Sequence, residues 1–169
     1  MSAKGIRDID VIRTFVLQGT LNFTRYFFKI RQKRKFVIGK HHREIAAALD
    51  KVLCGEITRL IINIAPRYGK TELAVKNFIA EGLAINPKAK FIHLSYSDDL
   101  ARDNSRGVQD IINEPEYRRI FPATIPTSTN TKKWYTTEGG GLYAVSSAGQ
   151  VTGFGAGLVD EEENDELAK

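Results

Sequence analysis

The stretch RLIINIAPRYGKTELAVKNFIAEGLA, residues 59 to 84, places an apolar run, a short polar loop and an amphipathic pattern in succession. The run at 59 to 65 is too apolar to alternate, as expected for a strand buried on both faces of a parallel sheet. From 71 to 84 the apolar side chains fall mostly on one side of a helix. They are Leu73, Val75, Phe78, Ile79 and Leu83. The stretch therefore predicts a strand, a loop and a helix.

A second unit of the same kind follows directly. KFIHLS, residues 90 to 95, comes after the turn-forming Asn86 and Pro87 and predicts a second strand. Ser97 is a suitable cap for the next helix, whose first turn carries the acids Asp98 and Asp99. Two strand and helix units in succession predict an α/β fold with a mainly parallel sheet.

The flanking segments extend this prediction in both directions. Residues 8 to 30 suit short helices, and a second amphipathic pattern from His42 to Leu53 stops at Gly55. Farther on, KKWYTTEGGGLYAVSS, residues 132 to 147, predicts a hairpin with a glycine turn. The resulting division is an N-terminal helical and basic segment at 1 to 40 and a core at 41 to 169 that ends in an acidic tail at 160 to 169.

The composition favours a soluble globular protein over a membrane-spanning one. The 169 residues are 42% hydrophobic and 27% charged, as in soluble globular proteins, and no apolar run approaches the roughly 20 residues that a bilayer requires. The single cysteine agrees with a reducing, intracellular compartment. The formal charge is +5, and a dense basic run at 29 to 43 is either a nucleic-acid contact or a solvated face. That run contains Lys29, Arg31, Lys33, Arg34, Lys35, Lys40 and Arg43.

The chemistry concentrates in the loop between the first strand and its helix. Gly69, Lys70 and Thr71 stand where backbone N–H groups of a loop and of a helix N-terminus bind a polyphosphate. Lys70 would reach the β and γ phosphates, and the Thr71 hydroxyl would bind Mg²⁺. The alternative is a helix N-terminus that merely exposes a lysine. The predicted binding residues are Pro66, Arg67, Tyr68, Gly69, Lys70, Thr71 and Glu72.

This loop departs from the common pattern GxxxxGK[ST], because Ile64 stands where the first glycine is expected. It also contains Arg67, two residues before Gly69. A guanidinium there would hold the γ-phosphate of a bound nucleotide or sense its loss. Alternatively, Arg67 pairs with a surface acid.

INIAPRYGKTELAVKNFIA, together with KFIHLSYSDDLA, KKWYTTEGGGLYA and QVTGFGAG, resembles the large terminase subunit of tailed bacteriophages over about residues 25 to 157. The resemblance implies a packaging ATPase of the additional-strand P-loop class, a three-layer sandwich with a mainly parallel sheet. In that class the loop characteristically bears an arginine, here Arg67, and lacks the first glycine, here Ile64. It further implies that residues around 36 to 42 contribute to adenine recognition.

The resemblance also implies the working context. ATP and Mg²⁺ would be the cofactors and ATP hydrolysis the reaction, with Lys70 and Arg67 among the catalytic residues. Duplex DNA, the portal protein and the small terminase subunit would be partners of a homo-oligomeric ring, in the cytoplasm of a bacterial host.

A Walker B element, which ends in Asp and Glu, should hold Mg²⁺ and activate water. LVDEE, residues 158 to 162, offers Asp160 as a metal ligand and Glu161 as the base. The competing interpretation is an acidic surface loop, with the true strand beyond Lys169 and the fold incomplete at the C-terminus. Two further hypotheses stay open: a helicase-like P-loop ATPase, and a truncated fragment that binds DNA or partners without hydrolysing ATP.

Overall fold

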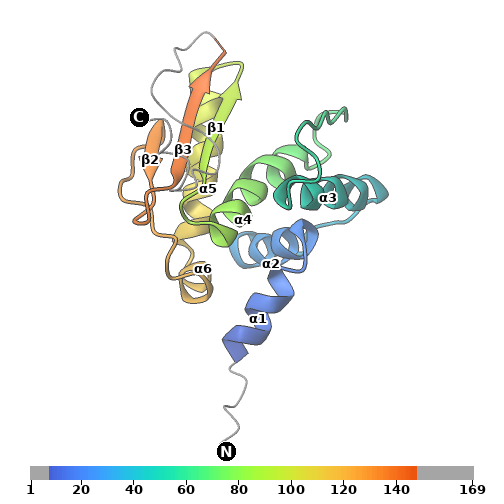
Figure 1. Cartoon of the computed structure of the whole chain (residues 1–169). Helices are drawn as coiled ribbons and strands as arrows, with labels where there is room; N and C mark the ends of the chain where they lie inside the picture. The colour runs from blue at the N-terminus through green and yellow to red at the C-terminus, as the bar shows by residue number, and fades with distance from the viewer. Residues whose placement is uncertain (1–7, 148–169) are drawn as a thin grey trace, which may run out of the picture.

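The computed structural model describes residues 8 to 147, and these form a mixed α/β structure. Helices dominate the first half of the chain, and the strands lie in the second half (Figure 1). The elements are α1 (Asp8–Val16), α2 (Thr20–Gln32), α3 (Lys40–Leu53), η1 (Glu72–Asn77), α4 (Phe78–Ile85), β1 (Lys90–Ser95), α5 (Asp98–Asn113), α6 (Pro115–Ile120), β2 (Lys133–Tyr135) and β3 (Gly141–Ser146).

The described sheet has three strands in the order β1-β3-β2. β1 and β3 run parallel from the pair Lys90 and Gly141 to the pair Ser95 and Ser146, whereas β2 is antiparallel to β3. Helix α5 packs against β1 and β3. The predicted strand at 90 to 95 and the glycine-turn hairpin are thus confirmed, and so is the α/β class in its general form.

The prediction of a strand at residues 59 to 65 is wrong. These residues form no strand, and the side chain of Ile61 is 87% exposed. An apolar run becomes a strand only where a neighbouring backbone satisfies its N–H and C=O groups, and the described sheet provides no such neighbour here. Consequently the three-layer sandwich with a mainly parallel sheet is not seen in residues 8 to 147, and the described sheet is small and mixed.

The main core joins the N-terminal helices to the rest of the molecule. Phe23 and Phe27 of α2 are fully buried, and the Phe27 ring lies 5.3 Å from the ring of Tyr117 in α6. The Tyr117 hydroxyl donates a buried hydrogen bond of 2.8 Å to the carbonyl of Ala80 in α4. The described helices of segment 1 to 40 therefore contribute side chains to the main core.

The helix predicted from 71 to 84 forms, but it begins in an unexpected way. Its first part, η1, is a π-helix, in which each turn is wider than in an α-helix. The buried amide of Asn77 donates 2.7 Å to the Glu72 carbonyl and so satisfies a group at the start of η1. A smaller cluster, formed by Ala46, Leu49 and Leu73, ties this helix to α3.

The remaining helices follow the sequence pattern. Ser97 caps α5, and its hydroxyl accepts a hydrogen bond of 3.3 Å from the Leu100 N–H, as predicted. Among residues 8 to 147, no helix combines the length and the hydropathy that a membrane crossing requires.

Candidate nucleotide-binding site

The loop before η1 has the backbone geometry of an anion-binding turn. Arg67 has a φ of 69° and Gly69 a φ of 74°, so two positions of one tight loop are left-handed. Helical structure begins at Lys70, and the Leu73 N–H donates 3.0 Å to the Gly69 carbonyl. Loops with left-handed residues just before a helix gather N–H groups into a concavity that suits phosphate.

A cavity of about 430 Å³ lies against this loop. Six of the seven residues predicted to bind the nucleotide line it, together with Ile64 and Ala65. The side chains of Arg67, Lys70 and Thr71 are all exposed, so two cations and a hydroxyl are free to face an incoming polyphosphate. The six are Pro66, Arg67, Gly69, Lys70, Thr71 and Glu72.

A second cavity, of about 530 Å³, adjoins the first and shares Arg67, Gly69 and Glu72 with it. Five of its thirteen lining residues carry aromatic rings, which suit the face of a nucleobase. Tyr68, the seventh predicted residue, lines this second cavity. The aromatic residues are Phe28, Phe36, His41, His42 and Tyr68.

His42 connects the two cavities. It is 7% exposed, and its Nε2 lies 2.9 Å from the Tyr68 carbonyl, while its Nδ1 accepts 2.9 Å from the Gly39 N–H. Burial lowers the pKa of His42 below its ordinary value, the neighbouring His41 lowers it further, and the Tyr68 carbonyl opposes both effects. From the sequence, His42 is only the first residue of an amphipathic pattern, and its contact with Tyr68, 26 residues farther along the chain, could not be predicted from local spacing.

The Glu72 carboxylate, at the edge of both cavities, is engaged by two neighbours. Its Oε1 accepts 2.8 Å from the Arg31 guanidinium of α2 and 3.0 Å from the Asn77 amide. The Arg31 and Glu72 side chains are 9% and 18% exposed, which makes this a partly shielded ion pair. Glu72 therefore braces the helix after the loop, a role that the sequence does not reveal.

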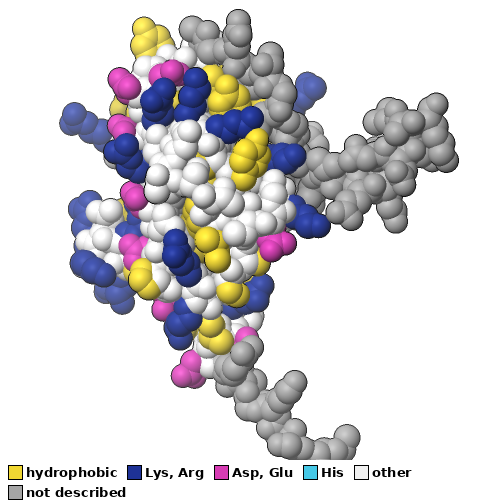
Figure 2. All heavy atoms as spheres, turned by 90° about the vertical axis from the view of Figure 1, so that its left-hand side faces the viewer, with side chains coloured by type: hydrophobic (Ala, Val, Ile, Leu, Met, Phe, Trp, Pro, Cys, Tyr) yellow, Lys and Arg dark blue, Asp and Glu magenta, His cyan; other side chains and the backbone are white. Residues whose placement is uncertain are grey.

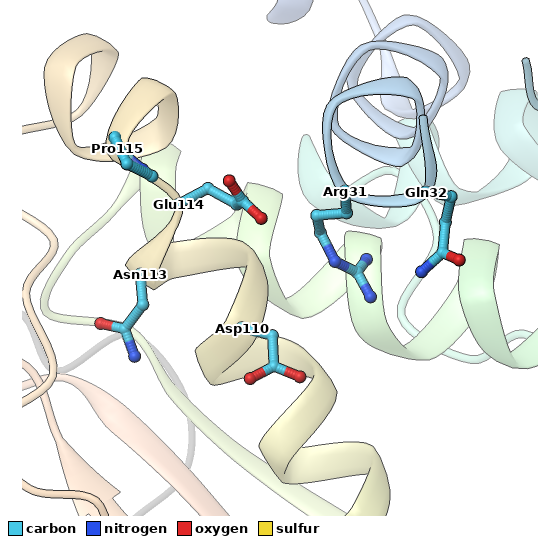
Figure 3. A pocket seen from close by; sticks show the side chains of 6 residues that line it. All are labelled: Arg31, Gln32, Asp110, Asn113, Glu114 and Pro115. Atoms are coloured by element: carbon cyan, nitrogen blue, oxygen red, sulfur yellow. The ribbon is translucent and has the colours of Figure 1, made fainter. Parts of the chain in front are cut away.

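Arg31 also borders a polar cavity of about 420 Å³ on its other side. Arg31 and Gln32 of α2 line it on one side, and Asp110, Asn113, Glu114 and Pro115 line it on the other, with the Glu114 carboxylate directed toward the Arg31 side (Figure 3). No group of three or more His, Cys, Asp or Glu within residues 8 to 147 is arranged to hold a metal ion. Of the predicted metal ligands, Thr71 lies at the loop, while Asp160 and the predicted base Glu161 lie outside the described residues.

The basic run at 29 to 43 is divided among several roles. Arg31 pairs with Glu72, Lys40 lies 3.8 Å from Glu44, and the Arg34 guanidinium lies 5.7 Å from the centre of the Phe28 ring. On the face shown in Figure 2, Lys and Arg side chains are interspersed with acids. Within the run, Arg31, Lys40 and Arg34 each contact a neighbouring side chain.

Comparisons with known proteins add no relative. No protein-family model, curated protein or solved structure matches the chain.

Proposed function

We propose that this chain binds ATP together with Mg²⁺ at the loop formed by residues 65 to 72. The observation that carries the proposal is the pair of adjoining cavities, one against a left-handed loop at a helix N-terminus and one lined in part by aromatic rings. A nucleotide has the same two parts, a polyphosphate and a flat base. Lys70 and Arg67 would neutralise phosphate charge, and the Thr71 hydroxyl would bind the metal.

We further propose that the chain is the ATPase part of a viral DNA-packaging motor. The motifs that resemble the large terminase subunit support this assignment, as do Arg67 and Ile64 at the positions where that family departs from the common loop. On this proposal the working protein is a ring that hydrolyses ATP and moves duplex DNA into a procapsid, in contact with a portal protein and a small subunit, inside a bacterial host.

The first test is saturable binding of a fluorescent ATP analogue with Mg²⁺. Lys70→Ala should weaken binding at least 100-fold, because the ammonium is the main cationic contact to the β and γ phosphates. Lys51→Ala is the matched control, since Lys51 is an exposed lysine on α3 outside both cavities, and it should bind as the wild type does. Equal binding by the Lys70 and Lys51 variants would refute the nucleotide site.

A second candidate function is nucleotide or partner binding without turnover. The hydrogen bonds of Glu72 favour this second function. Glu72 is the one carboxylate among the residues lining the two cavities, and because it is bound to Arg31 and Asn77 it cannot readily activate water. Release of inorganic phosphate from Mg-ATP separates the two functions. Lys70-dependent release supports an ATPase, and binding without release supports the non-hydrolysing alternative.

A further inference from the structure

The imidazole of His42 meets two backbone groups from different segments. One is the Gly39 N–H, which donates 2.9 Å to Nδ1, and the other is the Tyr68 carbonyl, 2.9 Å from Nε2. Gly39 lies before α3, whereas Tyr68 belongs to the phosphate-binding loop 26 residues farther along the chain. The ring therefore joins the wall of the aromatic cavity to the loop of the phosphate cavity.

These contacts fix the protonation state of the ring. Because Nδ1 accepts the Gly39 N–H, it must carry a lone pair, so the single proton of neutral His42 resides on Nε2. That proton is then donated to the Tyr68 carbonyl at 2.9 Å, and the His41 Nε2, 3.2 Å from the same nitrogen, is the second acceptor that it faces. A doubly protonated ring would place two N–H groups against each other at Gly39, so only neutral His42 completes both bonds.

The loop also packs directly against the ring. A Cβ placed at Gly69 would lie 2.8 Å from the His42 Nε2 and 3.4 Å from the Phe36 ring. The Phe36 ring is itself 4.9 Å from the His42 ring in an edge-on arrangement. Gly69 thus permits both the left-handed turn, with its φ of 74°, and the close approach of the imidazole.

We propose that His42 is a positioning residue that holds the phosphate-binding loop in its binding conformation by donating Nε2–H to the Tyr68 carbonyl, and that protonation of His42 releases this hold. The inference rests on the proposed nucleotide site. His42 acts on that site through the backbone of the loop, so it needs no contact with the phosphates.

Among the surrounding groups, His41 works against protonation of His42. His41, with its ring 3.9 Å away, is the other imidazole that faces His42, and Arg34, Lys35 and Arg67 line the same cavity as cations. The only acid lining that cavity is Glu72, which is already paired with Arg31. Burial and His41 lower the pKa of His42 from its ordinary 6.5, so the hold persists at neutral pH and is lost only as the pH falls below that value.

Two substitutions separate the two nitrogen atoms of the ring. In His42→Asn the side-chain oxygen takes the place of Nδ1, which keeps the Gly39 bond and removes the donor to Tyr68. In His42→Gln the side-chain amide N–H reaches the place of Nε2, which keeps the donor and cannot titrate. The two variants are therefore matched controls for one another, and both retain His41.

Two readouts are needed, one of which involves no nucleotide. In the nucleotide-free protein at pH 7.5, amide hydrogen exchange of residues 64 to 71 should be about tenfold faster in His42→Asn than in the wild type, and nearly unchanged in His42→Gln. Binding of the ATP analogue with Mg²⁺ should weaken about tenfold in His42→Asn. Between pH 7.5 and 5.5 the affinity of the wild type should fall several-fold more than that of His42→Gln. Titration of the nucleotide and of His41 occurs in both proteins, so the difference reports on His42 alone.

The outcomes decide the inference and the proposed function separately. If the wild type binds the analogue but His42→Asn matches it in both loop exchange and affinity, the positioning role is overturned. If the wild type fails to bind, the nucleotide site is refuted, while faster exchange of the loop in His42→Asn would still establish the hold on the loop. If His42→Asn does not fold, equal pH dependence of the wild type and of His42→Gln overturns the release by protonation.

Discussion

Glu81 is a carboxylic acid inside the main core. It belongs to α4 and is 1% exposed, in a helix whose other buried side chains are apolar or small. Burial raises the pKa of Glu81 to about 8, a contact with the Thr20 hydroxyl lowers it in part, and the charge of Asp50 raises it again. The folded protein therefore carries this group protonated at neutral pH, whereas the unfolded chain releases the proton near pH 4.5.

This difference predicts how stability depends on pH. Between pH 4.5 and 8 the folded state binds one more proton than the unfolded state, so the free energy of unfolding should fall as the pH rises, by about 1.4 kcal/mol per unit. Glu81→Gln cannot titrate and should be more stable than the wild type by roughly 3 kcal/mol at pH 7. Urea unfolding at pH 4.5, 6 and 7.5 measures the difference.

The comparison between the two proteins isolates this one group. Titration of His42 and His93, whose pKa values burial lowers, affects wild type and variant alike and cancels in the difference. At pH 4.5 the two proteins should be of nearly equal stability. Parallel stability curves over the whole range would show that Glu81 does not hold its proton in the folded state.

At the level of single residues, the sequence predicts the loop better than the groups that support it. Lys70, Thr71 and Arg67 are recognisable because their spacing from Gly69 is a local property. Glu81 and His42 acquire their properties from partners far along the chain, such as Thr20 and Tyr68. No spacing rule reports such partners, although a lone acid in the run FIAEGLAI is a visible anomaly.

Among the elements, the hairpin depends on two adjacent glycines for different reasons. Gly139 has a φ of 91°, and a Cβ there would meet nothing within 4 Å. At Gly140 a Cβ would lie 2.2 Å from the Pro87 carbonyl oxygen and 2.6 Å from that of Ala89. The first position requires a left-handed backbone, and the second requires empty space beside the turn that leads into β1.

Alanine substitution should separate these two requirements. Gly139→Ala should destabilise the fold by about 1 kcal/mol, the cost of a left-handed L-residue. Gly140→Ala should destabilise it by about 3 kcal/mol, because backbone carbonyls, unlike flexible side chains, cannot move aside cheaply. Chemical denaturation of both variants checks the order, which a larger loss for Gly139→Ala would contradict.

The contrast between two predicted strands explains where sequence patterns succeed. RLIINIA is the more apolar of the two runs, with five apolar residues of seven against three of six in KFIHLS, yet only KFIHLS becomes a strand in the described structure. Lys90 to Ser95 pairs along its whole length with Gly141 to Ser146. A strand is a property of two segments, so a run read by itself predicts only the capacity for pairing.

For the molecule as a whole, α2 is as central as the helices that follow the loop. Its buried rings contact α6, and its Arg31 reaches Glu72 beside the cavity. Local periodicity predicts the helices of residues 8 to 30 but not where they pack, since packing depends on contacts between distant segments. The described core contains side chains from both sides of residue 40, so the N-terminal helices pack onto the segments that follow them.

Truncation of two phenylalanines tests this continuity. Phe27→Ala should destabilise the whole protein by about 4 kcal/mol, since the side chain is fully buried among aromatic rings. Phe15→Ala is the control, because Phe15 is 44% exposed, and it should cost less than about 1 kcal/mol. Melting should stay a single transition in both variants when followed by circular dichroism and by Trp134 fluorescence, and separate transitions would mean that the N-terminal helices unfold independently.

The wide turn of η1 has a mechanical consequence for the loop that precedes it. A π-helix contains about one residue more than an α-helix of the same length, and the Asn77 amide secures this surplus at the Glu72 carbonyl. If η1 became an α-helix of the same length, about one residue would leave the helix and lengthen the preceding loop, while α4 would stay packed in the core. The π-helix thus holds one residue that could extend the loop, and the hydrogen bond from the Asn77 amide to the Glu72 carbonyl keeps that residue within the helix.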